Sequence, residues 1–236
     1  MICYVAGATG LVGSQLLQKL SIRSDVETVV ALVRKRPEHD VSGNDSRDGS
    51  NAEVVNKASY HVVNFDDPDS FPGLTGPVYC CLGTTIKKAG SQEAFRKVDY
   101  EYPLNLAKMC AKAGVAFYLV TALGSNASSG IFYNRVKGEL EEEVKKLPIP
   151  AIRIFRPSLL LGHRKEVRPG EMMGSVAAGL VNPLLLGPLK KYRAIRAEDV
   201  ARAMALPDQG SGMQILESYE IQARAEEFED SRRSGS

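Results

Sequence analysis

Residues 2–20 read Ile-Cys-Tyr-Val-Ala-Gly7-Ala-Thr-Gly10-Leu-Val-Gly13-Ser-Gln-Leu-Leu-Gln-Lys-Leu20, and this stretch decides the fold. It opens with a short apolar run of the kind that forms a buried strand, and from Leu11 onward apolar residues recur at helical spacing. Three glycines join the two patterns. The stretch therefore predicts a strand, a tight glycine loop and a helix in direct succession.

The glycine loop has the properties of an anion-binding turn. Glycine lets the chain turn tightly, lets backbone N–H groups approach a pyrophosphate and lets the helix pack closely on the sheet. The start of the helix also offers unpaired N–H groups and the favourable end of its dipole. The alternative is a turn that binds no ligand, because three glycines alone are weak support. At this position we favour dinucleotide binding through Gly7, Thr9, Gly10, Leu11 and Val12.

Strand and helix patterns alternate along the rest of the chain. The expected strands are 28–33, 60–63, 78–83, 115–120 and 152–155, and the long helical patterns are 91–113 and 133–147. Continuous apolar runs separated by helices are typical of a parallel sheet. We therefore predict a doubly wound, Rossmann-like α/β fold with helices on both faces of the sheet. A dinucleotide would lie along the edge where the strands end.

The chain length and local composition predict one domain. With 236 residues, the chain fits a single dinucleotide-binding unit over residues 1–225. Residues 37–58 are polar and rich in Gly, Ser, Asn and Asp, which predicts a flexible insertion. Residues 156–225 are dominated by small and apolar types and would build the substrate pocket. Residues 226–236 are charged and small, which predicts a disordered tail.

Composition excludes several classes of partner. The formal net charge of +2 gives no global field that favours nucleic acid or an anionic membrane. The four cysteines form no CxxC pair or Cys/His cluster, so we predict no metal site and no disulfide scaffold. The N-terminus lacks a basic region typical of a signal peptide, and no apolar run is long enough to span a bilayer. We therefore expect a soluble, cytoplasmic protein.

The end of the second predicted strand indicates which dinucleotide binds. An acidic residue there would favour NAD by accepting hydrogen bonds from the ribose hydroxyls. The sequence instead continues as Arg34-Lys35-Arg36, and a guanidinium can hold a 2′-phosphate through two parallel bonds. We therefore predict NADP as the cofactor, bound by Arg34 and Lys35. The alternative is an ordinary solvated basic turn.

Tyr133 and Lys137 lie four residues apart, and this spacing places them on one face of a helix. A phenol can donate a proton to a carbonyl oxygen as hydride arrives, and a neighbouring ammonium lowers the pKa of the phenol. The spacing alone is weak, and the alternative is an exposed pair. After the fifth strand, Thr121 is the first choice for a hydroxyl that polarises the carbonyl, and Ser125 is the second. Either hydroxyl could instead cap a turn.

Several further motifs carry a resemblance to a known family. They are Cys80-Cys81-Leu82-Gly83-Thr84-Thr85, Lys88-Ala89-Gly90, Phe95-Arg-Lys-Val98-Asp99, Phe132-Tyr133, Lys137-Gly138-Glu139, Phe155-Arg156-Pro157 and Arg168-Pro169-Gly170-Glu171. Together with the glycine spacing, they resemble the Tat-interactive-protein-like oxidoreductases. This family is an atypical branch of the short-chain dehydrogenase/reductase superfamily, close to its extended branch. The resemblance covers most of the chain.

The resemblance implies further cofactor contacts. By it, Leu82, Gly83, Thr84 and Thr85 line the adenosine and ribose side, and Asn64 and Phe65 lie near the adenine. Tyr133 and Lys137 hold the nicotinamide ribose, and Pro157 and Leu160 approach the nicotinamide amide. The family has Asp at the position of Asn64, and the alternative for this residue is a simple turn at a strand end. Arg156 is either an ion-pair partner or a contact for substrate or phosphate.

The sequence departs from the family at one segment that bears on catalysis. The family usually shows Ser-Ser-x-Gly-Ala where this chain has Thr121-Ala122-Leu-Gly-Ser125, so one serine is missing. We expect an NADP(H)-binding oxidoreductase that transfers hydride to or from a small carbonyl or alcohol. The alternative is a regulatory or interaction protein that binds NADP with weak or no turnover. A sugar-nucleotide epimerase is less favoured. Exposed faces of the two long helices could pair two copies into a homodimer.

Overall fold

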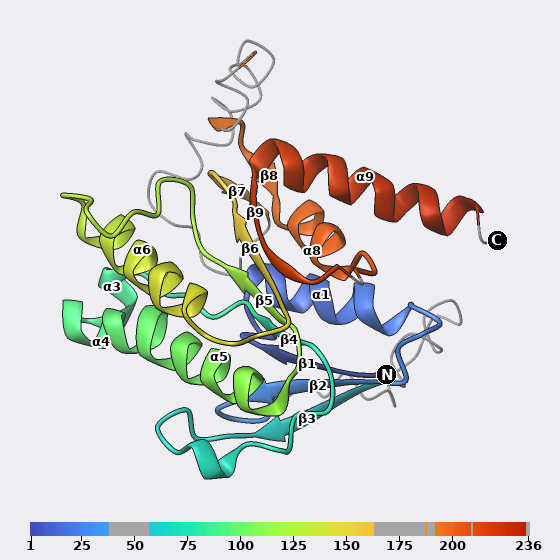
Figure 1. Cartoon of the computed structure of the whole chain (residues 1–236), viewed down its shortest axis with the longest axis horizontal. Helices are drawn as coiled ribbons and strands as arrows, with labels where there is room; N and C mark the ends of the chain where they lie inside the picture. The colour runs from blue at the N-terminus through green and yellow to red at the C-terminus, as the bar shows by residue number, and fades with distance from the viewer. Residues whose placement is uncertain (38–56, 163–186, 188–191, 209, 235–236) are drawn as a thin grey trace.

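The computed structural model describes residues 1–37, 57–162, 187, 192–208 and 210–234 (Figure 1). Most of the insertion predicted at 37–58 therefore lies outside the described residues. The same holds for the Arg168-Pro169-Gly170-Glu171 motif and for much of the predicted substrate-pocket region 156–225.

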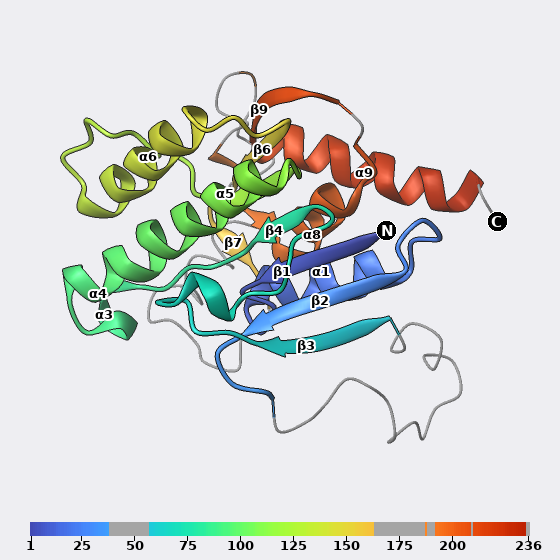
Figure 2. The same ribbon diagram turned by 60° about the horizontal axis from the view of Figure 1, so that its bottom comes forward.

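The described chain is built on a parallel sheet of seven strands in the order β3-β2-β1-β4-β5-β6-β9. The strands are β1 (Ile2–Ala6), β2 (Thr28–Val33), β3 (Ala58–Val62), β4 (Val78–Cys80), β5 (Phe117–Val120), β6 (Ala151–Arg156) and β9 (Gly212–Glu217). Figure 2 shows β3 at one edge, followed by β2 and β1. The strand order reverses between β1 and β4, and in doubly wound folds this reversal marks the ligand crevice. The predicted fold class is confirmed.

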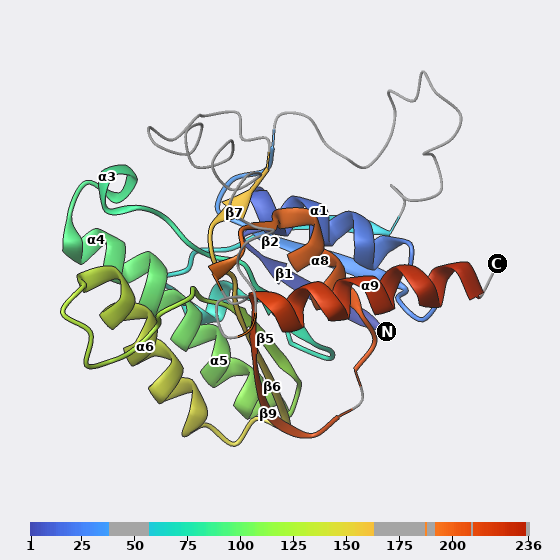
Figure 3. The same cartoon turned by 90° about the horizontal axis from the view of Figure 1, so that it is seen from above.

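Helices cover both faces of the sheet (Figure 3). On one face lie α1 (Leu11–Ser21), α8 (Ala197–Ala205) and α9 (Ser218–Ser234). On the other lie α5 (Tyr102–Ala113) and α6 (Phe132–Lys145). Short elements complete the described chain: the 3₁₀ turn η1 (Pro68–Ser70), α3 (Ile86–Ala89), α4 (Gln92–Arg96), the π-helical turn η2 (Lys97–Glu101), and the small parallel pair β7 (Leu160–Leu161) and β8 (Ile195–Arg196).

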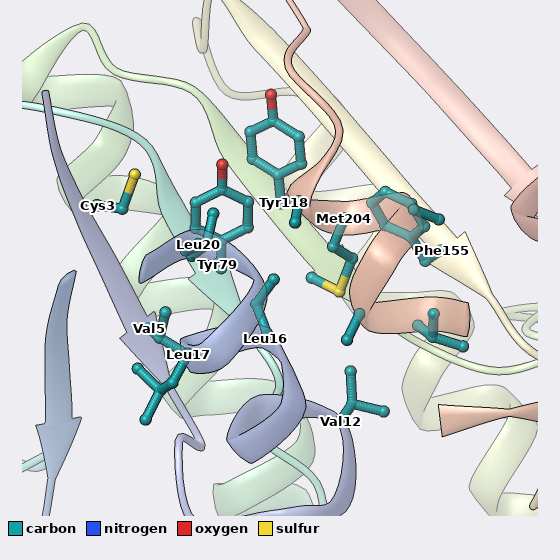
Figure 4. Packing of buried hydrophobic residues seen from close by; sticks show 14 of the residues in the cluster. Cys3, Val5, Val12, Leu16, Leu17, Leu20, Tyr79, Tyr118, Phe155 and Met204 are labelled. Carbon is teal, nitrogen blue, oxygen red and sulfur yellow. The ribbon is translucent and has the colours of Figure 1, made fainter. Parts of the chain in front are cut away.

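The core consists of two layers, one on each face of the sheet. Successive strand residues point to opposite faces, so Val5 packs under α1 while Ala6 packs under α5 and α6. Figure 4 shows the first layer, in which Leu16 from α1 and Met204 from α8 meet the aromatic side chains of the central strands. The rings of Tyr79 and Tyr118 stack there with centroids 4.5 Å apart.

The helix predicted over 91–113 is present over residues 92–113, but it is not a regular α-helix throughout. It consists of α4, the π-helical turn η2 and α5. Pro103 lies in the first turn of α5, where its missing N–H breaks the regular helical ladder. The N–H of Tyr102 reaches back to the Lys97 carbonyl, the longer bond of a π turn. The wider turn brings Asp99 into the interior.

The tail predicted to be disordered from residue 226 is instead helical, because α9 runs from Ser218 to Ser234. Ile221, Ala225 and Phe228 recur at helical spacing, and all three side chains are buried in the core layer beneath α8 and α9. Between them, Glu226 and Glu227 are exposed, whereas Arg224 donates to the Ala203 carbonyl and pairs with Asp208. The prediction of disorder failed because it relied on the charged composition of the segment, whereas a narrow apolar stripe on the helix packs into the core.

Replacing Phe228 with alanine is expected to lower the free energy of unfolding by about 3–5 kcal/mol, because a fully buried ring is lost and a cavity remains. Urea denaturation measures this change. Glu227→Ala is the matched control, because Glu227 is exposed on the same helix and its loss should change stability by no more than about 0.5 kcal/mol. Equal stability of the two variants would contradict the packing of α9.

Candidate cofactor and catalytic site

The glycine loop between β1 and α1 requires glycine at two points of close backbone approach. Gly7 has φ 80°, and a Cβ there would lie 2.5 Å from the Cys81 carbonyl oxygen. A Cβ on Gly13 would lie 2.2 Å from the Gly7 carbonyl oxygen. The N–H of Gly10 donates to that same oxygen over 2.9 Å, which closes the turn. The backbone of this loop, called the glycine cradle below, is therefore packed so closely that a side chain at Gly7 or Gly13 would clash with backbone atoms.

The cradle suits the pyrophosphate of a dinucleotide. Gly10 caps α1, and within the described chain no side chain accepts the N–H groups at that cap. The first turn of α1 also carries no acidic residue that would repel an anion. Leu11 lies beside the end of β7, since a Cβ on Gly162 would be 2.8 Å from its Cδ1 atom. The predicted residues of the loop thus fit the cofactor, and Leu11 joins them to the segment after β6.

The residues predicted to contact the adenosine lie where β2 and β3 end. Arg34 and Lys35 directly follow β2 and are exposed. Phe65 is buried against the rings of Phe71 and Tyr102, at centroid distances of 5.4 and 5.3 Å. Partial burial raises the pKa of the Tyr102 phenol, and the positive charge of Arg34 opposes this rise. The charges after β2 therefore act on the same region as the aromatic side chains after β3.

Asn64 forms the turn at the end of β3. Its side-chain oxygen accepts the N–H of Asp66 over 3.1 Å, and its own N–H donates to Ser70. These contacts correspond to the alternative of a simple strand-end turn. A contact of Asn64 with the adenine stays a prediction.

The loop after β4 lies against the glycine loop. A Cβ on Gly7 would be 2.9 Å from the backbone nitrogen of Leu82, so the two predicted cofactor segments are adjacent. Gly83 is exposed, while Thr84 and Thr85 are half-buried. The Thr85 hydroxyl caps α3 by accepting the N–H of Lys88. The structure thus brings the segment Leu82 to Thr85 to the same end of the sheet as the cradle.

Tyr133 and Lys137 lie on one face of α6, as predicted. Tyr133 is half-buried, with its ring centroid 5.6 Å from that of Phe95. Lys137 is buried, and its Nζ lies 2.7 Å from Oδ1 of Asp99. Burial by itself lowers the pKa of Lys137, but the electrostatic interactions with Asp99 and Tyr133 and the hydrogen bond to Asp99 outweigh it and raise that pKa above its ordinary value. Lys137 is therefore a charged group at neutral pH.

The two hydroxyls after β5 are already engaged with protein groups. Thr121 is buried and donates its hydroxyl hydrogen to Oε1 of Glu141 over 2.7 Å. Ser125 is also buried and donates to the carbonyl of Ala122 over 2.7 Å. Neither hydroxyl, in this arrangement, offers its hydrogen to a ligand.

Glu141 is also the ion-pair partner of Arg156. The Arg156 guanidinium binds both carboxylate oxygens of Glu141 and lies 3.4 Å from Glu217. Of the two roles considered for Arg156, the structure shows the ion pair. Pro157, which follows it, accepts the N–H of Leu123 over 2.9 Å and so ties the loop after β5 to the end of β6. Leu160 pairs with Ile195 in the small β7–β8 sheet.

Two functional candidates escaped the sequence analysis: Asp99 and Glu141, both buried. Asp99 stood within a quoted motif but received no role. Glu141 lies four residues after Lys137, which lies four after Tyr133, so one face of α6 carries a phenol, an ammonium and a carboxylate in succession. This spacing could have indicated Glu141 as a site residue, because it places a carboxylate on the same helix face as Lys137. A carboxylate that becomes buried there needs a partner.

Two further features concern only the part of the chain that is described. There, no three His, Cys, Asp or Glu side chains gather in a way that could hold a metal ion. No helix there is both long and apolar enough to cross a bilayer.

Solved structures share the fold. UDP-glucuronic acid 4-epimerase from Bacillus cereus, in complex with NAD, has a TM-score of 0.63 at 17% identity and covers 93% of this chain and 78% of its own. Vestitone reductase from alfalfa has a TM-score of 0.57 at 18% identity and covers 92% of this chain and 76% of its own. At such low identity, the likeness shows the fold alone.

Curated relatives are more similar in sequence. Protein HTATIP2 of Rattus norvegicus is 33% identical over 226 residues, which cover 92% of this chain and 86% of the relative. The mitochondrial protein FMP52-1 of Scheffersomyces stipitis is 33% identical over 198 residues, which cover 80% of this chain and 76% of the relative. No family model matches the chain.

The strand order, the glycine cradle and the relatives together define an NAD(P)-binding fold of the short-chain dehydrogenase/reductase type. Within that class, the chain belongs to the family of the HTATIP2 and FMP52 proteins, an atypical branch of the superfamily. The resemblance predicted from the sequence is confirmed.

The predicted cytoplasmic location is wrong in light of the relatives. Several similar fungal proteins carry names that place them in mitochondria. The reasoning from unpaired cysteines failed because a chain without disulfides or metal motifs is compatible with more than one compartment.

Proposed function

We propose that this protein binds NADP(H) and transfers hydride between it and a small carbonyl or alcohol. The observation that carries the proposal is the Tyr133–Lys137 pair on α6, in which the buried Lys137 is held as a cation. This pair is linked, through Asp99 and Thr84, to the loop that lies against the glycine cradle. When bound, the cofactor supplies or accepts the hydride.

Side chains of the protein carry out proton transfer, ribose binding and polarisation of the carbonyl. Tyr133 donates a proton to the carbonyl oxygen during reduction and takes one from the alcohol during oxidation. The Lys137 ammonium favours the ionised phenol and binds the ribose hydroxyls. Thr121 or Ser125 polarises the carbonyl only if its hydroxyl leaves its present acceptor, which is Glu141 or the Ala122 carbonyl.

The choice of NADP over NAD rests on Arg34 and Lys35. Both are exposed at the end of β2, where the adenosine ribose lies in this fold. Positive charge at this position favours a 2′-phosphate, and residues 34–37 contain no carboxylate that would repel it.

A second candidate function is a cofactor-dependent binding protein whose NADP occupancy alters a surface recognised by another macromolecule. The observation that favours it is the segment 121–125. Thr121 and Ser125 both donate to the protein itself, and Ala122 stands where the family usually has a serine. In this arrangement no hydroxyl of the segment polarises a carbonyl, which would leave cofactor binding intact and slow reduction.

Turnover separates the two candidates. The purified protein is mixed with NADPH and a panel of small aldehydes and ketones, and the loss of NADPH is followed by absorbance. NADPH consumption that depends on the carbonyl compound supports the oxidoreductase. NADPH binding without consumption across the panel supports the binding protein instead.

A further inference from the structure

The loop between β5 and α6, residues 121–131, rests on the helix with almost no space between the two backbones. Figure 1 shows this loop leaving the end of β5 and returning to the start of α6. A Cβ on Gly138 would lie 2.2 Å from the Asn126 carbonyl carbon and 2.2 Å from the Ala127 nitrogen. Since Cβ contacts this short essentially never occur, only glycine at position 138 leaves room for the loop.

The backbone conformation of Gly138 does not itself require glycine. Gly138 lies in the middle of α6 and is not among the described glycines with positive φ. Within a helix, glycine is less favourable than alanine, because it loses more conformational freedom on folding. A glycine here therefore weakens the helix, and what it provides in return is the close contact with the loop.

Further contacts hold the loop in one place on α6. The N–H of Asn126 donates to the Asn134 carbonyl over 3.0 Å. Nη1 of Arg135 donates to the Ser129 carbonyl over 2.9 Å. The side-chain oxygen of Asn126 also accepts the N–H of Ser128 over 2.8 Å, which shapes the loop itself. The loop is thus a folded segment with a defined position on the helix.

The point of closest approach joins two parts of the candidate site. Gly138 directly follows Lys137 on α6, and Asn126 directly follows Ser125 on the loop. The separation between the hydroxyls of the loop and the Lys137 ammonium is therefore set where Asn126 lies against Gly138.

We propose that Gly138 is a positioning residue of the active site: its bare backbone seats the loop against α6 and so fixes Thr121 and Ser125 relative to Tyr133 and Lys137. This inference rests on the proposed function of that tyrosine and lysine. Gly138 acts through the loop, because it has no side chain that could take part in the reaction.

Gly138→Ala tests this role. The new methyl group must move the loop or the helix by about 1 Å, and a misplacement of this size can cost about 100-fold in rate. We therefore expect kcat for carbonyl reduction to fall by about 10- to 100-fold. The NADPH dissociation constant should change by no more than about three-fold, because the glycine cradle belongs to β1 and α1. Both constants are measured on folded protein, whose concentration is set by titration with NADPH.

Gly130→Ala is the matched control. Gly130 is exposed in the same loop, and a Cβ there would meet nothing within 4 Å, so kcat should stay at the value of the unmodified protein. A Gly138→Ala protein with a lowered melting temperature but the kcat of this control would overturn the proposal. Gly138 would then be a packing residue only.

Arg135→Ala covers the case in which Gly138→Ala does not fold. This change leaves Gly138 in place and removes the half-buried tie to the Ser129 carbonyl. Loss of one hydrogen bond that orders the loop should lower kcat by about three- to ten-fold and leave NADPH binding intact. An unchanged kcat in this variant would overturn the proposal.

The unmodified protein separates this inference from the proposed function. If it reduces a carbonyl compound and the variants of Gly138 and Arg135 reduce it equally fast, only the role of Gly138 fails. If it reduces none, the proposed function fails, and the inference fails with it.

Discussion

Replacing Tyr133 with phenylalanine is expected to lower the rate of carbonyl reduction by about 100- to 10,000-fold, the usual contribution of a positioned acid or base. The substitution removes only the phenol oxygen. The aromatic ring remains, with its centroid 5.6 Å from that of Phe95, so the helix and the position of Lys137 should be preserved. NADPH affinity should change by only a few fold. Steady-state rates with an accepted carbonyl substrate, together with the NADPH dissociation constant, measure both effects.

Tyr219→Phe is the matched control for this variant. Tyr219 is 49% exposed at the start of α9, outside the site, and loss of its hydroxyl should leave the rate unchanged. A Tyr133→Phe protein that reduces the substrate as fast as the control would remove Tyr133 from the chemistry.

Replacing Gly13 with alanine is expected to weaken NADPH binding by about 10- to 100-fold. The new Cβ would lie 2.2 Å from the Gly7 carbonyl oxygen and 2.8 Å from the Gly7 carbonyl carbon, and neither backbone atom can rotate away. Either α1 or the glycine loop must shift, at a cost of about 1–3 kcal/mol. A displaced loop no longer presents its N–H groups to the pyrophosphate. Calorimetric titration with NADPH measures the loss, and thermal unfolding measures the strain.

Gly73→Ala controls for the change of residue type. Gly73 lies in a region where a Cβ would meet nothing within 4 Å, so its replacement should alter neither NADPH binding nor stability noticeably. If Gly13→Ala bound NADPH as tightly as Gly73→Ala, the cradle would not be the pyrophosphate site.

The sequence was sufficient for the features set by short-range pattern. The apolar run of β1, the glycine loop and the amphipathic α1 were each readable locally, and the apolar strands predicted the parallel sheet. Several elements went unnoticed, among them α8, β9 and α9. The edge strand β9 is mostly exposed and lacks a continuous apolar run, and α9 buries only a narrow stripe beneath charged residues.

The site was less accessible to sequence analysis, because its contacts join distant segments. The spacing of Tyr133 and Lys137 was visible in the sequence. The pairing of Lys137 with Asp99 depends on a π turn, which the helical periodicity of the apolar residues did not predict. Likewise, the engagement of Thr121 with Glu141 depends on how β5 packs beside α6. Which hydroxyl faces a ligand is a matter of tertiary structure.

Calorimetric titration of the unmodified protein with NADPH and with NADH tests the central claim most directly. The account predicts that NADPH binds about ten-fold or more tightly than NADH, and that Arg34→Ala removes most of this preference because a charged contact to the 2′-phosphate is lost. The absence of binding to either dinucleotide would contradict the account. It would leave the protein with the fold of its family and without the proposed cofactor.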